Sequence, residues 1–220
     1  MYVGTSTAVA FALFGYILGR QADRLAMLSE TDVLTGLANA RGLFERLEAE
    51  LARSRRYHEP LALLLVDLDG LKRINDRYGH HAGDEAIRSL AAVIRFQLRE
   101  SDVGARWGGD EFAVLAPNTS EHDAVALAER IRSSISEQNA GSPLSGSVGV
   151  AAITPAEDGE FVDSAALMRA ADAALYEAKR RGRNRVVVAS SGRARLSAHV
   201  AGPGDGPHTS RRSASAGHVS

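Results

Sequence analysis

The chain has 220 residues, of which 24% are charged and 45% are hydrophobic, and its formal net charge is −1. This length and composition fit one globular domain with attached segments, and the near-zero net charge gives no reason to expect a nucleic acid as a partner. Cysteine is absent, which excludes disulfides, thiolate nucleophiles and zinc sites built on cysteine.

The amino-terminal segment Tyr2–Gly19 contains no charged side chain, and Arg20 and Arg24 follow it. A run of about 18 apolar residues is long enough to span a bilayer, and the basic residues after it predict that the rest of the chain lies in the cytoplasm. We therefore expect residues 1–19 to form a transmembrane anchor, with no periplasmic sensor domain. The alternative is a helix that packs on a partner or on the domain. A signal peptide is disfavoured because a basic first region is missing.

Residues 20–31 continue in a helical pattern, with Leu25 and Leu28 one turn apart. A helix that leaves a membrane with such a narrow apolar stripe can pair with its own copy. We expect a juxtamembrane helical linker in these residues.

The first predicted elements of the domain are a helix and a buried strand. Asp32–Asn39 is expected to be a loop that ends in Asn39, the N-cap of a helix over about Ala40–Tyr57. The unbroken apolar run Leu61–Val66 indicates a central strand covered on both faces. Asp67 and Asp69 follow this run and point to one face if the strand continues. We expect Asp67, which is nearer the core, to be the functional acid, whereas Asp69 better fits a solvated strand end.

A short helix carrying Lys72, Asn75 and Asp76 is predicted next, and a loop over Tyr78–Asp84 follows it. The loop leads into an amphipathic helix, which is indicated by the spacing of Ile87, Leu90, Ala91, Ile94 and Leu98. The loop contains the adjacent residues His80 and His81, but neither has a further histidine at the spacing that zinc ligands take on a helix. We therefore expect no zinc site.

The stretch Arg106–Phe112, with the sequence R-W-G-G-D-E-F, joins two runs that have the composition of strands, Asp102–Arg106 and Phe112–Ala116. Such runs joined by glycines and acids predict a β-hairpin. The glycines let the backbone approach a bulky partner, and the adjacent carboxylates of Asp110 and Glu111 need a partner if they are buried. A divalent cation is the candidate, because hard cations take oxygen ligands. A plain acidic turn is the alternative, but the second acidic strand end upstream favours the cation.

Helices and strands continue to alternate after the hairpin. The predicted order is a capping box at Ser120–Asp123 that opens a helix to about Gln138, a strand over Ser145–Ile153, a helix capped by Asp163 or Ser164, and a strand over Arg185–Val188. The basic stretch Lys179–Asn184 complements a helix dipole and can also meet phosphates. This order predicts an α+β sandwich. Residues 190–220 have few apolar side chains and are expected to be disordered.

Five separate stretches resemble, in order, the motifs of the GGDEF family, the diguanylate cyclases. They are Asp32–Asn39 (D-x-L-T-G-L-x-N), Asp67–Asp76 (D-x-D-x-x-K-x-x-N-D), Tyr78–Asp84 (Y-G-H-x-A-G-D), the signature Arg106–Phe112, and Ala178–Asn184 (A-K-x-x-G-R-N). The resemblance covers residues 32–189, with small departures such as Trp107 where tyrosine is usual. It implies a palm-like α+β nucleotidyl-cyclase sandwich, in which helices flank a mostly antiparallel sheet and a β-hairpin carries the signature.

The resemblance also implies an activity, the condensation of two GTP into cyclic di-GMP with release of pyrophosphate. Each domain of a homodimer would hold one GTP, and the 3′-hydroxyl of one GTP would attack the α-phosphate of the other. Mg²⁺ (or Mn²⁺) would neutralise the phosphates and the leaving group. The implied location is the bacterial inner membrane with the catalytic domain in the cytoplasm, or the cytoplasm alone if the first helix does not insert.

Roles for individual residues follow from the same resemblance. The metal would be held by Asp67, the Leu68 carbonyl, Asp110 and Glu111, and the last two would also be the catalytic residues. The residues expected to bind substrate are Asn75 and Asp84 at the guanine, Gly108 and Gly109 where the nucleotide needs room, and Lys72, Lys179 and Arg183 at the phosphates. Arg99 and Asp102 resemble the family's R-x-x-D inhibitory site for cyclic di-GMP, and a local helix-end pair is the alternative.

Three other functions remain open at this point. A receptor for GTP or cyclic di-GMP without turnover is disfavoured by the intact stretch Gly108–Phe112. A structural or interaction domain is disfavoured, because the residues expected to bind guanine and phosphates would then have no reason to occur together. A cyclase with a mononucleotide or mixed product is disfavoured by Asn75 and Asp84, which suit guanine.

Overall fold

The structure is a computed structural model that describes residues 29–138, 144–154 and 162–189. The expected membrane anchor in residues 1–19, most of the linker in residues 20–31 and the tail from residue 190 lie outside these ranges. Among the residues described, no helix has the length and apolar content that a membrane span requires.

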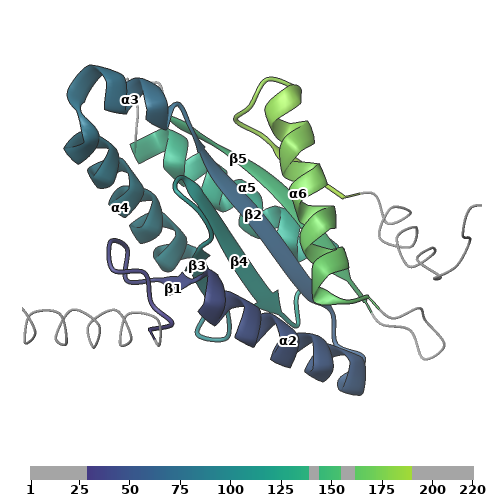
Figure 1. Ribbon diagram of the computed structural model, residues 1–220. Coiled ribbons are helices and arrows are strands. Elements are labelled where there is room, and N and C mark those ends of the chain that lie inside the picture. The colour runs from purple at the N-terminus through teal and green to yellow at the C-terminus, as the bar shows by residue number, and fades with distance from the viewer. Residues whose placement is uncertain (1–28, 139–143, 155–161, 190–220) are drawn as a thin grey trace, which may run out of the picture.

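A six-stranded sheet lies at the centre of the fold, with the strand order β1-β3-β4-β2-β5-β6 (Figure 1). The strands are β1 Ala38–Asn39, β2 Leu61–Asp69, β3 Val103–Arg106, β4 Glu111–Pro117, β5 Ser145–Ile153 and β6 Val186–Val188. The pairings among β3, β4, β2 and β5 are antiparallel, and the two edge pairings, β1 with β3 and β5 with β6, are parallel. The predicted hairpin and the mostly antiparallel α+β sheet are therefore confirmed.

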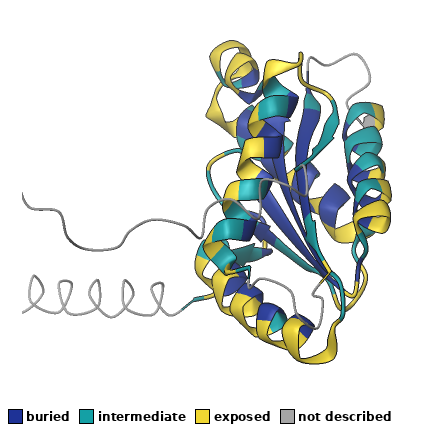
Figure 2. Cartoon of the chain, turned by 90° about the vertical axis from the view of Figure 1, so that its right-hand side faces the viewer, coloured by how far each residue is buried: buried dark blue, intermediate teal, exposed yellow. Residues whose placement is uncertain are grey.

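Helices cover both faces of this sheet. They are α2 Ala40–Tyr57, α3 Leu71–Tyr78, α4 His80–Gln97, α5 Glu121–Gln138 and α6 Ser164–Arg180. Alternate residues of β2 belong to two cores: Leu64 and Val66 pack in the core that also contains α4 and α5 side chains, and Leu63 and Leu65 pack in the core that contains α2 and α6 side chains. Every residue of β2 is buried, as the dark central strands in Figure 2 show. The prediction of a strand covered on both faces is thus confirmed.

Three predicted helix starts have the expected caps. The Asn39 side chain accepts a hydrogen bond from the Gly42 N–H at 3.0 Å, and Asp163 accepts from the Ala166 N–H at 2.6 Å. Ser120 and its capping partner Asp123 are joined by two hydrogen bonds ahead of α5. Each such cap contributes about 1 kcal/mol to helix stability, so the polar residues at these positions fix where the helices begin.

Two local predictions were wrong. The stretch Tyr78–Asp84 is not a loop, because α4 begins at His80 and only Gly79 separates it from α3. Gly79 makes this sharp junction possible: its φ is +83°, which glycine adopts without strain, and its N–H donates to the Asn75 carbonyl at 2.9 Å. The two-residue strand β1 was expected as loop, and it exists because it pairs with β3.

Candidate active site

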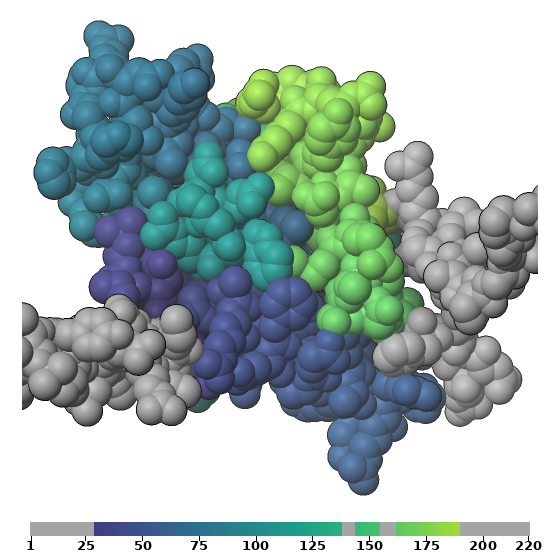
Figure 3. All heavy atoms as spheres, in the orientation of Figure 1, coloured from purple at the N-terminus to yellow at the C-terminus, as the bar shows by residue number. Residues whose placement is uncertain are grey.

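The expected metal-binding, catalytic and substrate-binding residues gather at one end of the molecule. The carboxyl-terminal ends of β2 and α6, the start of α3 and the β3–β4 turn all lie toward the top of Figure 1. In the space-filling view, hairpin residues reach the surface between the α3–α4 pair and α6 (Figure 3). Helices from both faces of the sheet therefore contribute to this end.

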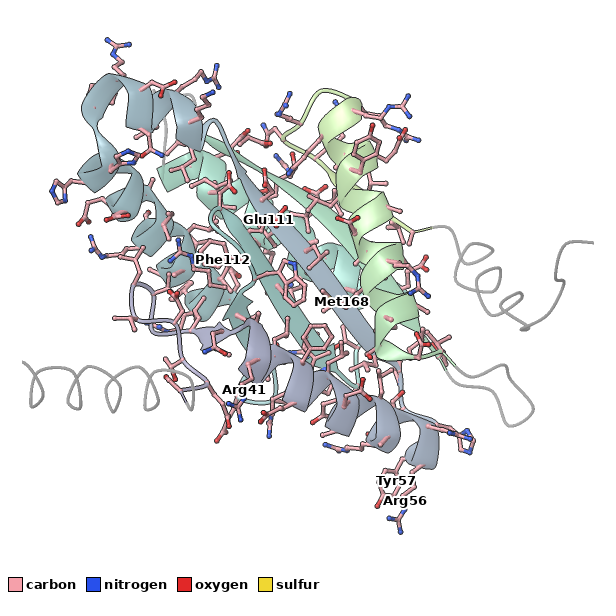
Figure 4. The ribbon with its side chains drawn as sticks, viewed as in Figure 1. Arg41, Arg56, Tyr57, Glu111, Phe112 and Met168 are labelled. Atoms are coloured by element: carbon pink, nitrogen blue, oxygen red, sulfur yellow. The ribbon has the colours of Figure 1, made fainter. Side chains whose placement is uncertain are left out.

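The register of β2 and β4 brings the two acidic sequence stretches together. Asp67 lies directly opposite Glu111 in this antiparallel pair, and the Leu68 N–H donates to the Asp110 carbonyl at 3.1 Å. Figure 4 shows Glu111 at the beginning of β4, beside Phe112. The Phe112 ring is fully buried in the core under α4 and α5, so Glu111 takes the opposite face, toward α6.

Asp67 is a buried acid with a cationic partner from α6. Lys179 Nζ lies 2.7 Å from Oδ2 of Asp67 and 4.0 Å from Oε1 of Glu111. Burial raises the pKa of Asp67 above its ordinary value, the Lys179 contact lowers it in part, and the nearby Asp110 and Asp69 carboxylates raise it again. Negative charge therefore exceeds the positive charge available around Asp67.

This excess of carboxylate oxygen fits a divalent cation such as Mg²⁺, which prefers oxygen ligands and is usually bound by one or two carboxylates together with substrate phosphates. In the part of the chain that the structure describes, no three His, Asp or Glu side chains converge as a ready-made metal cage. A cation held by Asp67, Asp110 and Glu111 would thus need the Leu68 carbonyl and oxygens from a bound ligand to complete its coordination.

Arg106 fixes the tip of the hairpin. Its Nε donates to the Gly108 carbonyl at 3.1 Å and its Nη2 to the Gly109 carbonyl at 2.8 Å. Its Nη1 lies 3.3 Å from Oδ2 of Asp32, whose Oδ1 accepts from the N–H and hydroxyl of Thr35 at 2.9 and 2.7 Å. Burial by itself would raise the pKa of Asp32, but the Thr35 hydrogen bonds and the Arg106 charge outweigh burial and lower it.

The two glycines of the turn leave room for different neighbours. A Cβ added at Gly109 would meet no atom within 4 Å, so the space there is open to a ligand. A Cβ added at Gly108 would lie 3.0 Å from Oε2 of Glu111. The nucleotide was expected to need both positions, but in this structure Gly108 makes room for the Glu111 side chain.

On the other face of the sheet, the side-chain oxygen of Asn75 is available to accept a hydrogen bond. Its Oδ1 is buried and has no hydrogen-bond partner, although buried polar atoms are nearly always paired. The side chain lies against Gly83, where an added Cβ would be 1.9 Å from Oδ1. Asp84, half-buried, follows in the first turns of α4, and Lys72 is exposed on α3. Asn75 and Asp84 thus lie close together, as expected for residues that bind one base.

The expectation for Asp69 was wrong. It is not a solvated strand end, because β2 continues through Asp69 and only 3% of its side chain is exposed. The carboxylate accepts hydrogen bonds from the hydroxyls of Ser145 and Ser147 and from the Asn184 N–H. It also lies 3.6 Å from Nε of Arg183, so Asp69 contacts the loop that carries one expected phosphate ligand.

The expected inhibitory pair lies away from the acids, at the carboxyl-terminal end of α4. The Asp102 carboxylate accepts from the Arg99 N–H at 2.9 Å, and the Asp102 N–H donates to the Arg99 carbonyl at 3.1 Å. Both residues line a cavity of about 460 Å³ that also includes Arg46 and Arg95, and a smaller one of about 60 Å³ that includes Arg130. The local turn described by the alternative interpretation exists, and two cavities adjoin it.

Sequence reasoning missed three residues of this region. Asp32 and Arg106 each lie within a recognised motif. Nothing in the sequence indicated that these two side chains, 74 positions apart, contact each other. Phe44 packs on Trp107 with ring centroids 5.3 Å apart, and nothing in its local sequence separates it from an ordinary apolar residue of α2.

Comparison with known proteins gives one consistent family. A family model described as the GGDEF domain of diguanylate cyclases matches residues 29–185. The chain is 46% identical over 164 residues to the diguanylate cyclase DgcP of Pseudomonas aeruginosa, which is 72% of this chain and 24% of that protein. It is 38% identical over 181 residues to the response regulator PleD of Caulobacter vibrioides, covering 77% of this chain and 38% of that protein. The chain spans less than half the length of these two relatives.

Solved structures agree with this result. The GGDEF domain of DgcB from Caulobacter crescentus, solved in complex with c-di-GMP, matches with a TM-score of 0.67 at 34% identity, covering 74% of this chain and 94% of that one. Diguanylate cyclase SiaD from Pseudomonas aeruginosa, solved with its activator SiaC, matches with a TM-score of 0.65 at 36% identity, covering 84% and 72%. The palm-like α+β fold is therefore confirmed, and the chain belongs to the GGDEF domain family of diguanylate cyclases.

Proposed function

We propose that the protein is a diguanylate cyclase that condenses two GTP into cyclic di-GMP and releases pyrophosphate. The observation that carries this proposal is the register of β2 and β4, which places Asp67 opposite Glu111 and joins Leu68 to Asp110 at the end of the sheet. An intact signature alone is a sequence pattern, whereas this register brings the acidic end of β2 beside the acids of the hairpin, which supports the oxygen-ligand site that nucleotidyl transfer would need.

We infer that each domain binds one GTP across the end of the sheet. The buried, unpartnered Oδ1 of Asn75 accepts a hydrogen bond from the guanine, and Asp84 beside it accepts a second. Lys72, Lys179 and Arg183 bind the phosphates from the two sides of the sheet. Adenine presents an acceptor where guanine presents its N1–H, so these two acceptors favour GTP over ATP.

Asp67, the Leu68 carbonyl, Asp110 and Glu111 would hold Mg²⁺ (or Mn²⁺), which when bound neutralises the charge that develops on the phosphates and the leaving group. Asp110, at the tip of the hairpin, would also accept the proton of the attacking 3′-hydroxyl. Lys179 pairs with Asp67, and it would be available to the phosphates if a cation took its place beside that carboxylate.

Two domains must face each other, because one domain with one GTP supplies only one of the two 3′-hydroxyls consumed. We propose a homodimer for this reason, held in part by the linker in residues 20–31. A membrane anchor in residues 1–19 would keep two copies in one plane, and the domain in residues 32–189 would then carry the chemistry.

Product inhibition is the final part of the proposal. Arg99 is exposed beside the cavity of about 460 Å³, and its guanidinium can bind a phosphate or stack on guanine. The Asp102 carboxylate holds the turn that presents Arg99. Cyclic di-GMP bound here would restrain two domains outside the arrangement that catalysis needs.

Product analysis tests the proposed function. The full chain is incubated with GTP and Mg²⁺, and the nucleotides are separated by chromatography. We expect cyclic di-GMP and pyrophosphate in a ratio of one to two, no product with ATP, and a rate that declines as product accumulates. A folded dimer that binds GTP without forming product would contradict the activity and favour a receptor for GTP or cyclic di-GMP.

A further inference from the structure

Asp69 is a buried acid with no part in the proposed chemistry. Its side chain is 3% exposed, and it follows Asp67 by two residues on the same strand. Burial of a carboxylate is unfavourable unless hydrogen bonds replace the lost water. The groups that replace water around Asp69 therefore indicate what the residue does.

Two of these groups are hydroxyls from the neighbouring strand. Ser145 lies opposite Asp69 in the β2–β5 pair, and its Oγ donates to Oδ2 at 3.0 Å. The buried Ser147 Oγ lies 3.0 Å from Oδ1 and 2.9 Å from Oδ2. The serines hold the carboxylate in one orientation, with Oδ2 directed so that it can accept a further donor.

That further donor comes from the turn after α6. The Asn184 N–H donates to Oδ2 at 3.2 Å. Gly182, Arg183 and Asn184 have φ values of +107°, +62° and +47°, and for the last two this conformation is unfavourable unless surrounding contacts stabilise it. Asp69 supplies one such contact from inside the protein. A second comes from α5, where Arg132 Nη1 donates to Oδ1 of Asn184 at 2.9 Å.

The turn holds Arg183 beside Asp69, which lies two residues from Asp67 on β2. Nε of Arg183 lies 3.6 Å from Oδ1 of Asp69, while 62% of the Arg183 side chain is exposed and thus accessible to a ligand. Lys179, one turn earlier in sequence, contacts Asp67. The two acids of β2 thus contact different cations: Asp67 contacts Lys179 in the last turn of α6, and Asp69 contacts Arg183 in the turn that follows.

We propose that Asp69 is a positioning residue that holds the Gly182–Asn184 turn so that Arg183 contacts the triphosphate of the bound nucleotide. The inference rests on the proposed function, because it assigns Arg183 a phosphate to bind. It gives Asp67 and Asp69 different tasks: Asp67 contributes to the charge cluster at the hairpin, and Asp69 organises the phosphate-binding turn.

Two ligands separate a positioning role from a general structural one. 3′-Deoxy-GTP keeps the guanine and the triphosphate but lacks the attacking hydroxyl, so its binding can be measured without turnover. GMP keeps the guanine and lacks the β- and γ-phosphates. For the Asp69→Asn variant of the full chain, we expect affinity for 3′-deoxy-GTP to fall about tenfold and affinity for GMP to change by less than about twofold, as for one lost charged contact.

A second variant changes the conformation of the Gly182–Asn184 turn without altering a buried charge. Gly182 is exposed, and its φ of +107° is unfavourable for alanine, so Gly182→Ala displaces the turn directly. We expect the same selective loss of 3′-deoxy-GTP affinity, and this variant decides the matter if Asp69→Asn does not fold. Asp172→Asn makes the same chemical change on the exposed face of α6 and is expected to bind both ligands as the wild type does.

The outcomes separate the inference from the proposed function. Equal losses for GMP and 3′-deoxy-GTP, or no loss for either, in both variants would contradict the positioning role. If the wild type binds neither ligand, the proposed function itself fails. If the wild type binds 3′-deoxy-GTP and both variants keep the wild-type ratio of affinities for 3′-deoxy-GTP and GMP, the inference about Asp69 is wrong and the proposed function stands.

Discussion

Lys179 Nζ lies 2.7 Å from Oδ2 of Asp67, so the last turn of α6 supplies the counter-charge for a buried acid at the end of β2. The Asp67 side chain is 9% exposed and that of Lys179 is 30% exposed. A divalent cation bound beside Asp67, as proposed, would take over the role of this ammonium group. The Lys179 ammonium group therefore offsets part of the effect of burial, which raises the pKa of Asp67.

Replacing Lys179 by methionine is expected to lower the free energy of unfolding by about 2 kcal/mol at neutral pH, because Asp67 then stays buried without its cation. The change also raises the pKa of Asp67 further above its ordinary value of 3.8. Above that ordinary value the folded chain retains a proton that the unfolded chain releases, so the stability of the variant falls as the pH rises through the folded pKa.

Urea denaturation of the wild type and of Lys179→Met, from about pH 4 to about pH 8, measures this dependence. Adding Asp67→Asn to Lys179→Met removes the buried acid and is expected to remove the extra pH dependence. A stability difference between wild type and Lys179→Met that is constant with pH would contradict the account.

Asp110→Ala is expected to abolish pyrophosphate release from GTP while leaving the urea midpoint within experimental error. The residue lies at the tip of the hairpin, where its side chain is half-buried, and the contacts that fix the tip come from Arg106 to carbonyl groups. Glu137→Ala, on the exposed face of α5, is the matched control and should keep full activity. Activity retained in Asp110→Ala would exclude Asp110 from the metal site.

Asp32→Asn should destabilise the chain by about 1 kcal/mol near neutral pH, because the Thr35 and Arg106 donors lose an ionised acceptor. Since these contacts lower the pKa of Asp32 below 3.8 despite its burial, its stabilising effect is complete above that value and is lost as the pH falls through the folded pKa. Urea unfolding at about pH 7 and at acidic pH should therefore show a difference between wild type and variant that becomes smaller as the pH falls. The turnover rate should also fall, since Arg106 then holds Gly108 and Gly109 less firmly.

Gly83→Ala is expected to reduce the preference for GTP over ATP, because the added Cβ would lie 1.9 Å from the Asn75 Oδ1 and must displace that amide. Helix propensity favours alanine over glycine by about 1 kcal/mol, so a loss of guanine preference or of stability in this variant would come from the displaced Asn75 side chain. The rate ratio for GTP and ATP gives the measurement. Combining Gly83→Ala with Asn75→Ala should relieve the clash and recover stability, but not the preference for guanine.

Arg99→Ala is expected to leave the initial rate unchanged and to prevent the rate from declining as cyclic di-GMP accumulates. Arg99 lines the cavity of about 460 Å³ at the end of α4, which lies away from Asp67. Progress curves with and without added cyclic di-GMP test the effect. Inhibition equal to that of the wild type would remove Arg99 from the regulatory site.

Most of the fold could be predicted because its elements are locally encoded. The apolar run of β2, the caps at Asn39 and Asp163, and the glycine-containing hairpin specify their own conformations. The two-residue β1 carries no such signal, because it depends on pairing with β3. The start of α4 was missed for a related reason: its first residues are polar, and their helical conformation depends on the turn at Gly79.

The candidate site was predictable as a set of residues and less so as an arrangement. The motifs named Asp67, Asp110 and Lys179, but the contact between Asp67 and Lys179 spans 112 positions and depends on how α6 packs on the sheet. Asp69 shows the limit most clearly. The alternation along β2 places it beside Asp67, yet its burial depends on serines from β5 and on a turn 115 positions away.

The two cores on either side of β2 have one more consequence. Asn75 and Asp84 belong to helices that pack on one face of the sheet, and Lys179 belongs to the helix on the other. A nucleotide held by both groups would join the two helical layers across the end of the sheet. Ligand at about 100 times its Kd stabilises the folded state by about 2.7 kcal/mol, and here that gain would be shared, so that α4 and α6 become resistant to proteolysis together.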